Sequence, residues 1–220
     1  MDYGGPAKSL SVREFLVKKI IVGLVGAVVV AGLGVGLWFF LDSSAVAATV
    51  GQTKITVSQV DSSIKEILAE RKTVSTTGMQ LATGSALSAQ QLNFYIISTL
   101  LAQTVAANNL TVSAAQVSAR EATISKQEGT AAKLKSGEVS AGIASRDFPN
   151  YVREILFVEA LTALVEKQGT AVADSGTAVQ GLVRAQAAKV GVTIKDSKKY
   201  GTWDPTQVTV VPPSTTSTTK

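Results

Sequence analysis

The sequence predicts a mainly α-helical protein, in which one N-terminal transmembrane helix precedes one exported helical domain with short strands near both of its ends. Two observations predict this class. An uncharged apolar run extends from Ile20 to Leu41, and apolar residues recur at helical spacing through most of the chain beyond it. Because a helix rises about 1.5 Å per residue, the run is long enough to cross a hydrocarbon core roughly 30 Å thick.

Charge predicts the orientation of this helix. The leader, residues 1–19, carries more Lys and Arg than Asp and Glu, whereas Asp42 directly follows the run. Basic residues that flank a first membrane segment stay in the cytoplasm, so we expect a single-pass protein of the cell membrane with an extracytoplasmic C-terminal domain. A cleaved signal remains the alternative, because Ala45–Ala47 is a small-x-small site before Ala48. Cleavage there would make the protein secreted.

Small residues recur at every fourth position of the predicted membrane helix. Such spacing lets two helices approach closely, so this face predicts packing against another membrane protein as well as contact with the lipid bilayer. The candidate packing residues are Gly23, Ala27, Ala31, Gly32 and Gly36.

The chain contains no His and no Cys. Their absence excludes Ser-His-Asp and Cys-His catalysis, zinc sites with His or Cys ligands, disulfides and a lipid-modified cysteine. No basic cluster predicts nucleic-acid binding. We therefore expect no enzyme activity, no metal and no cofactor. An enzyme that uses carboxylates alone is the least favoured alternative.

The exported domain is predicted to begin with a hairpin over 47–55 that turns at Gly51. A helix capped by Ser58 should follow, since Val60, Ile64 and Ile67 share one helical face. Residues 73–84 are expected to form a mobile loop.

The next helix is predicted to start at Ser88, where Gln91 completes a capping-box pattern, and to end at Asn108 and Asn109. A weakly amphipathic helix should follow the cap residue Ser113. Residues 129–146 are rich in Gly, Ser and Ala, and they are expected to be mobile.

Asp147 is expected to cap the most apolar helix of the exported part. After a linker over 169–176, a last helix should end at Gly191 in a left-handed cap. Short strands are predicted over 192–194 and 207–211, before a disordered tail over 212–220.

Two short motifs mark the ends of the exported part. The first is an Ala-x-Val-Gly-x-x-x-Ile-Thr-x-x-x-Val stretch formed by Ala48, Val50, Gly51, Ile55, Thr56 and Val60, and the second is Tyr-Gly-Thr-Trp-Asp over 200–204. With these motifs the chain resembles the SurA/PrsA class of extracytoplasmic foldases in bacterial envelopes. The likeness is to their SurA N-terminal-like chaperone module, over residues 45–211.

The resemblance implies that the early strands pair with the C-terminal strand in a small sheet, which closes a helical cradle for unfolded polypeptides. Many members carry a parvulin-type isomerase domain where this chain has only the 169–176 linker. Parvulins use paired His residues, which are absent here, so the resemblance implies no isomerase activity. One departure is Ser197 to Lys199, where the family often has Asn-Pro-Arg.

Five aromatic residues are candidates for contact with a bound peptide, although residues at such spacing more often form the core. They are Phe94, Tyr95, Phe148, Tyr151 and Trp203. Tyr95 and Tyr151 are the stronger candidates, because an exposed Tyr offers a ring and a hydroxyl. Trp203 is favoured as a core anchor.

The sequence therefore predicts a membrane-anchored chaperone that binds unfolded or newly exported polypeptides. The alternative is an accessory or assembly subunit of a membrane complex that uses the same fold as a docking module.

Overall fold

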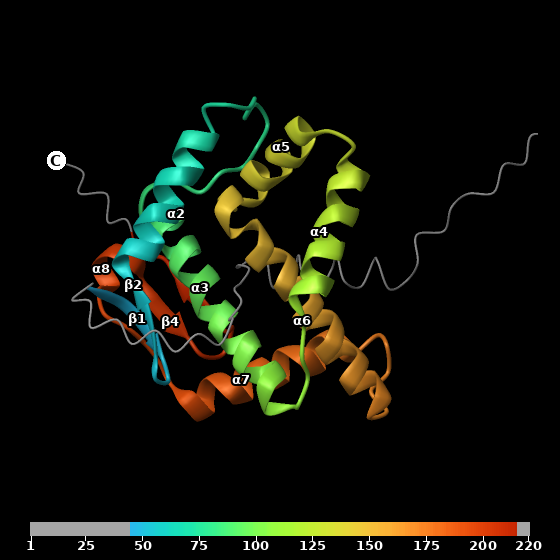
Figure 1. The fold of residues 1–220 in the computed structure, drawn as a ribbon. Coiled ribbons are helices and arrows are strands. Elements are labelled where there is room, and N and C mark those ends of the chain that lie inside the picture. Colours follow the sequence, from blue (N-terminus) through green and yellow to red (C-terminus); the bar gives the residue numbers. More distant parts are fainter. Residues whose placement is uncertain (1–44, 215–220) are drawn as a thin grey trace, which may run out of the picture.

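The computed structural model describes residues 45–214, which form a helical domain with two small antiparallel sheets (Figure 1). In chain order the elements are β1 (Val46–Val50), β2 (Thr53–Thr56), α2 (Val57–Glu70), α3 (Gly84–Ala107), α4 (Ala114–Glu128), α5 (Ala131–Ala141), the 3-10 turn η1 (Ser145–Asp147), α6 (Phe148–Lys167), α7 (Ser175–Val190), β3 (Val192–Ile194), α8 (Ser197–Tyr200), β4 (Thr202–Asp204) and β5 (Thr209–Val211). The predicted mainly helical class of the exported part is confirmed.

The predicted hairpin is present as β1 and β2, which pair antiparallel across a turn at Gly51. Gly51 has φ +59°, a conformation that favours glycine, and its N–H donates to the Gly191 carbonyl at 2.9 Å. On its other edge β1 pairs with β3, so the sheet order is β2-β1-β3. This sheet therefore joins the start of the domain to the segment after α7.

The C-terminal strand does not join that sheet, which corrects the expected pairing. β5 pairs only with β4 in a separate two-stranded sheet, and it begins at Thr209 rather than at 207. The early strands thus meet β3, while the Tyr-Gly-Thr-Trp-Asp motif supplies the partner of the last strand.

Two capping boxes start helices, but only one uses the predicted residue. Ser113 caps α4 and its side chain accepts from the N–H of Gln116, as expected. In α2 the cap is Thr56, not Ser58, because the Thr56 hydroxyl accepts from the N–H of Gln59 and the Gln59 side chain accepts from Thr56. Reciprocal bonds of this kind satisfy donors that the first helical turn leaves open.

The prediction for the start of α3 is wrong. The helix begins at Gly84, and Thr83 at its N-cap makes no side-chain cap bond. Ser88 lies inside the helix, and Gln91 donates to the Gly142 carbonyl at 2.9 Å instead of completing a capping box. The end of the helix agrees with the prediction, since Asn108 is its C-cap.

The segment 129–146 is ordered as α5 and η1 over most of its length, which corrects the expectation that it is mobile. Thr130 caps α5 by accepting from the N–H of Lys133, and the left-handed residues Gly129 and Gly142 bound the helix. Glycines that suggest a loop therefore serve as helix ends. The end of α7 at Gly191 is confirmed, although its φ of 77° and ψ of 141° are not those of a left-handed cap.

α3 is the central element of the core. It packs against α2, α6 and α7 and also against β1, β5 and α8. Its middle is buried on every face, and polar residues such as Gln91, Asn93 and Ser98 are buried there among the apolar ones. In Figure 1, α2 and α3 lie on one side, α4 and α6 on the other, and α5 between their upper ends.

No helix among residues 45–214 is long and apolar enough to cross a membrane. The predicted membrane helix over 20–41 and its packing residues Gly23, Ala27, Ala31, Gly32 and Gly36 lie outside the described residues, so they remain predictions.

Candidate functional site

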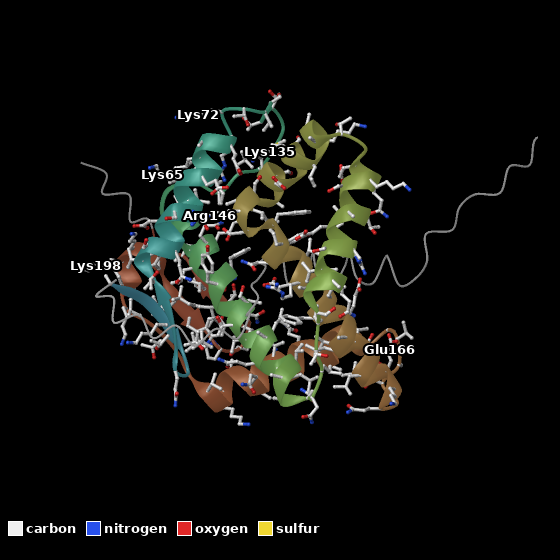
Figure 2. The ribbon with its side chains drawn as sticks, in the orientation of Figure 1. Lys65, Lys72, Lys135, Arg146, Glu166 and Lys198 are labelled. Carbon is white, nitrogen blue, oxygen red and sulfur yellow. The ribbon has the colours of Figure 1, made fainter. Side chains whose placement is uncertain are left out.

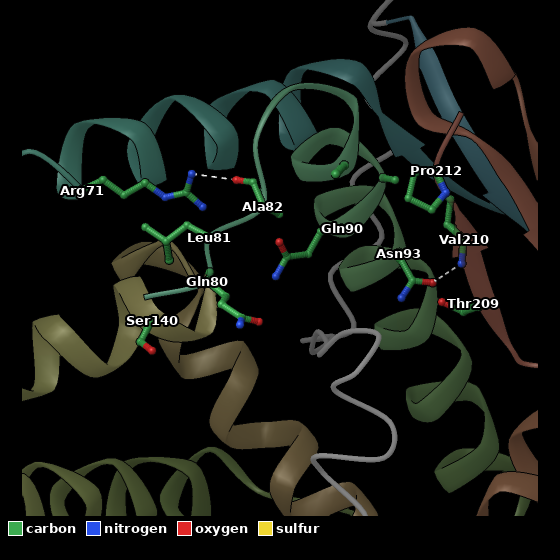
Figure 3. Close-up of a pocket in the computed structure, with 13 residues that line it drawn as sticks. Arg71, Gln80, Leu81, Ala82, Gln90, Asn93, Ser140, Thr209, Val210 and Pro212 are labelled. Carbon is green, nitrogen blue, oxygen red and sulfur yellow. Dashed lines mark hydrogen bonds between the residues drawn. The ribbon is translucent and has the colours of Figure 1, made fainter. Parts of the chain in front are cut away.

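A pocket of about 310 Å³ opens beside the N-terminal half of α3 (Figure 3). Its walls come from the loop after α2, the end of α5 and the β5 segment. The residues that line it are Arg71, Gln80, Leu81, Ala82, Ala86, Ala89, Gln90, Asn93, Ser140, Gly142, Thr209, Val210 and Pro212. Segments far apart in sequence thus meet at one site, and its volume is at the lower end of the range for ligand pockets.

Small side chains keep this pocket open, and amide side chains make it polar. Ala82, Ala86 and Ala89 contribute little volume, while Gln80 and Gln90 bring groups that can both donate and accept hydrogen bonds. Figure 3 shows the Gln90 side chain extending from α3 between the loop and β5. Such a lining can pair with the backbone of an extended polypeptide.

Arg71 is the single charged residue of the pocket lining. Its Nη1 donates to the Ala82 carbonyl at 2.8 Å, which ties the end of α2 to the loop before α3. Its Nε and Nη2 are shielded from solvent and have no hydrogen-bond partner among residues 45–214. Desolvation lowers the pKa of Arg71 from its ordinary value, although a guanidinium remains charged in proteins.

Asn93 connects α3 to β5 at the opposite end of the pocket. Its side-chain Oδ1 accepts from the Val210 N–H at 2.7 Å, so it pairs with the edge of β5 that faces away from β4. Only 1% of Asn93 is exposed, and its Nδ2 has no partner in the described part of the chain. A shielded donor without an acceptor therefore lies at each end of the pocket.

A buried polar junction lies between α2, α3 and η1. The Ser63 hydroxyl lies 2.6 Å from the Tyr95 hydroxyl and donates to Asp147 Oδ2 at 2.5 Å. Burial raises the pKa of Asp147, and burial with the nearby Asp147 carboxylate raises the pKa of Tyr95 to about 12. Asp147 occupies the N-cap position of α6 but makes no cap bond, because its carboxylate faces this junction.

A second polar cluster fixes α5 against α2. Lys135 bonds to Glu70 and to the Ser145 hydroxyl, and Ser145 bonds to Glu138. Figure 2 shows Lys135 between α2 and α5. The Glu70 carboxylate also accepts from the Ser145 N–H at 3.1 Å, so these charges hold the helices around the pocket in place.

Glu154 is a buried acid at the contact of α6 with α3. It is 4% exposed, and its carboxyl accepts a hydrogen bond from the Ser98 hydroxyl at 3.0 Å. Burial raises its pKa well above the ordinary value of 4.5. Uncompensated burial of a carboxylate favours the protonated form.

We expect Glu154→Gln to stabilise the protein at pH 8 by about 1–3 kcal/mol and to have little effect at pH 4. Because the folded-state pKa is raised, the folded protein keeps a proton that the unfolded chain releases above about pH 4.5. Wild-type stability therefore falls as pH rises from the unfolded pKa through the folded pKa, whereas glutamine does not titrate. Urea unfolding of both proteins across this range measures the difference, with exposed Glu128→Gln as the control. Parallel pH profiles for wild type and Glu154→Gln would contradict the prediction.

The structure places the five aromatic candidates in three locations. Phe94 and Tyr95 are 3% and 9% exposed, and their rings meet edge to face with centroids 5.0 Å apart, so the expected exposure of Tyr95 is not found. Phe148 and Tyr151 are half-buried at the start of α6, with stacked rings 6.3 Å apart. Trp203 is half-buried and packs against the core from β4.

None of these five residues lines the described pocket. Sequence reasoning missed Arg71, Gln90 and Asn93, which do. A signal is present, because Gln90, Gln91 and Asn93 interrupt the start of an otherwise apolar helix. Buried amides at such positions need partners from another element, and the sequence does not say which element that is.

The sequence matches the family of the SurA-like N-terminal domain over residues 11–162, which is more than half of the chain. The chain belongs to this family. The predicted resemblance is thereby confirmed, although the match starts before the predicted span and ends within α6. No curated protein matches the chain, and neither does any solved structure.

The SurA-like N-terminal domain indicates a chaperone-like role outside the cytoplasm and binding of unfolded polypeptides in general. The match covers β1 to most of α6, including every pocket residue except those of the β5 segment. In this chain the last wall of the pocket therefore comes from outside the matched residues.

Proposed function

We propose that the protein is a membrane-anchored extracytoplasmic chaperone that binds unfolded or newly exported polypeptides and has no prolyl isomerase activity. The match to the SurA-like N-terminal domain carries this proposal. The apolar run over 20–41 with its basic flank supports the anchor and the orientation. The chain has no His, which supports the absence of parvulin chemistry.

The pocket beside α3 is the proposed contact site for a client. Its amides can pair with the backbone of any sequence, which suits a protein that must accept many clients. The stacked pair of Phe148 and Tyr151 is a second proposed contact, since half-buried aromatic side chains offer apolar area at little entropic cost. Phe94 and Tyr95 are less suited, because they are buried in the core, whereas Tyr151 and Trp203 are half-buried and pack against it.

The proposal is tested by following the aggregation of a denatured test protein with the full-length chain in detergent micelles. We expect suppression near equimolar ratios, whereas empty micelles should have no effect. Unchanged aggregation at a molar excess of the chain would contradict the proposal.

A matched pair of substitutions locates the contact. Ala86 and Ala122 are both exposed helical residues, but only Ala86 lines the pocket. We expect Ala86→Trp to raise the concentration needed for half-suppression about tenfold, because the indole fills the pocket and removes about 1.4 kcal/mol of binding. Ala122→Trp should behave as wild type, and equal behaviour of the two variants would place the client elsewhere.

A second function is favoured by the small-residue face of the predicted membrane helix. Gly23, Ala27 and Ala31 would let another membrane helix pack closely, as in an accessory subunit of a membrane complex. Extraction in mild detergent followed by size analysis separates the two functions. A stoichiometric partner that is lost in Ala27→Leu supports the accessory role, and a lone monomer contradicts it.

A further inference from the structure

Arg71 has a charged head group with two hydrogen-bond donors that have no acceptor among the described residues. These donors, Nε and Nη2, are neighbouring N–H groups on one edge of the guanidinium and form its fork. No carboxylate among residues 45–214 forms an ion pair with it, and the neighbouring Glu70 bonds to Lys135 and Ser145 through Oε1. A buried donor without an acceptor costs free energy, and more so when it is charged.

The side chain can bring this fork into the pocket. Arg71 already lines the pocket, and within the described chain one hydrogen bond, to the Ala82 carbonyl, holds its head group (Figure 3). Gln80 beside it is exposed, and Leu81 is half-buried. A rotation of the guanidinium toward the cavity would give up the bond to Ala82 and expose the fork in the pocket.

The start of α3 adds positive potential at the same end of the pocket. Thr83 gives no side-chain cap, the first turn holds no acidic residue, and Ala86 of that turn lines the pocket. Open N–H groups and the helix dipole favour an anion at such a terminus. No lining residue is acidic, so nothing in the lining opposes negative charge.

Asn93 supplies an independent donor at the other end. Its buried Nδ2 has no partner within residues 45–214, and its Oδ1 is already occupied by the Val210 N–H. From Ala86 to Asn93 the pocket follows about two turns of α3, or roughly 10 Å, which is the length of about three extended residues. A short extended segment can thus reach both orphan donors.

We propose that this pocket binds a carboxylate group of an extended polypeptide, with the Arg71 fork as its anchor and Asn93 Nδ2 as a donor to a backbone carbonyl of the same segment. The proposal rests on the proposed chaperone function and deepens it by naming the chemical group that is selected. Arg71 fits this role because a guanidinium pairs with a carboxylate through two parallel hydrogen bonds. The carboxylate has two possible sources, a C-terminus or an internal Asp or Glu.

Fluorescence anisotropy of short labelled peptides with the full-length protein in micelles tests the proposal. The reference peptide has an amidated C-terminus and an internal Asn. One partner peptide carries a free C-terminal carboxylate, and another carries Asp in place of Asn. We expect at least one of these to bind about ten- to a hundredfold more tightly than the reference, and the peptide that does so identifies the source.

Three substitutions assign the effect to Arg71. Arg71→Gln should reduce the affinity of the carboxylate peptide to that of the reference peptide, and Arg71→Lys should retain part of it because it keeps the charge without the fork. Arg184→Gln, on the exposed face of α7, makes the same charge change away from the pocket and should bind as wild type.

Equal affinity of wild type for all peptides would overturn the carboxylate proposal, and this comparison needs no variant to fold. If aggregation is still suppressed in that case, the proposed chaperone function stands without it. An equal loss in Arg71→Gln and Arg184→Gln would also overturn the proposal, since a general loss of positive charge would then explain the data.

Discussion

Gly201→Ala is expected to destabilise the protein by about 4 kcal/mol and to lower its Tm by roughly 8–16 °C. Gly201 lies between α8 and β4 with φ +93°, a conformation that side chains rarely adopt. A Cβ at this position would lie 1.9 Å from the Val211 carbonyl oxygen, which belongs to the backbone of β5. Alanine therefore forces β5 away from α8, and the bond between Val210 and Asn93 at the pocket should be lost with it.

Gly169→Ala is the matched control for this substitution. Gly169 has φ +97°, but a Cβ added there would meet nothing within 4 Å, so only backbone strain applies. Its expected cost is about 1–2 kcal/mol. Thermal melts followed by circular dichroism in one detergent compare the two variants. If Gly201→Ala lowers the Tm no more than Gly169→Ala does, then β5 can shift without a loss of stability, and the prediction is wrong.

Leu100→Ala is expected to lower the free energy of unfolding by about 3–5 kcal/mol. Leu100 is fully buried on α3, the helix against which α2, α6 and α7 all pack. Removing its side chain loses transfer free energy and leaves a cavity that fixed neighbouring helices cannot fill. Urea unfolding should show a lower midpoint with an unchanged m-value, as expected when stability alone changes.

Leu68→Ala provides the comparison on an exposed site. Leu68 is 44% exposed on α2, and leucine and alanine are both good helix formers. Leu68→Ala is therefore expected to change the free energy of unfolding by no more than about 0.5 kcal/mol. Similar losses in the two variants would mean that helix propensity, not burial in the core, sets the cost at Leu100.

Local patterns predict much of the fold. The turn at Gly51, the cap at Ser113 and the C-terminal ends of α3 and α7 depend on residues that are neighbours in sequence, and each lies close to its predicted position. Errors arise where two local solutions compete. Thr56 and Ser58 can both cap a helix, and Thr56 does so because Gln59 lies three residues after it.

The candidate site is less predictable. Tyr95 is expected from the sequence to be exposed, but its hydroxyl bonds to Ser63 and Asp147, which are 32 and 52 residues away. Asn93 bonds to Val210, 117 residues later. Such pairs carry no spacing signal, because the partner of a buried polar group depends on how whole elements pack.

The sequence by itself determined the family and the excluded His and Cys chemistries, and it predicts an export signal or anchor, because composition and short-range patterns carry that information. Only the tertiary structure decided that β5 pairs with β4, that Asp147 faces a buried junction, and that α3, α5 and β5 enclose a pocket beside Arg71. The physical reason is that hydrogen bonds and burial between distant segments depend on how the helices pack. Helix starts, turns and the length of an apolar segment depend instead on residues that are neighbours in the sequence.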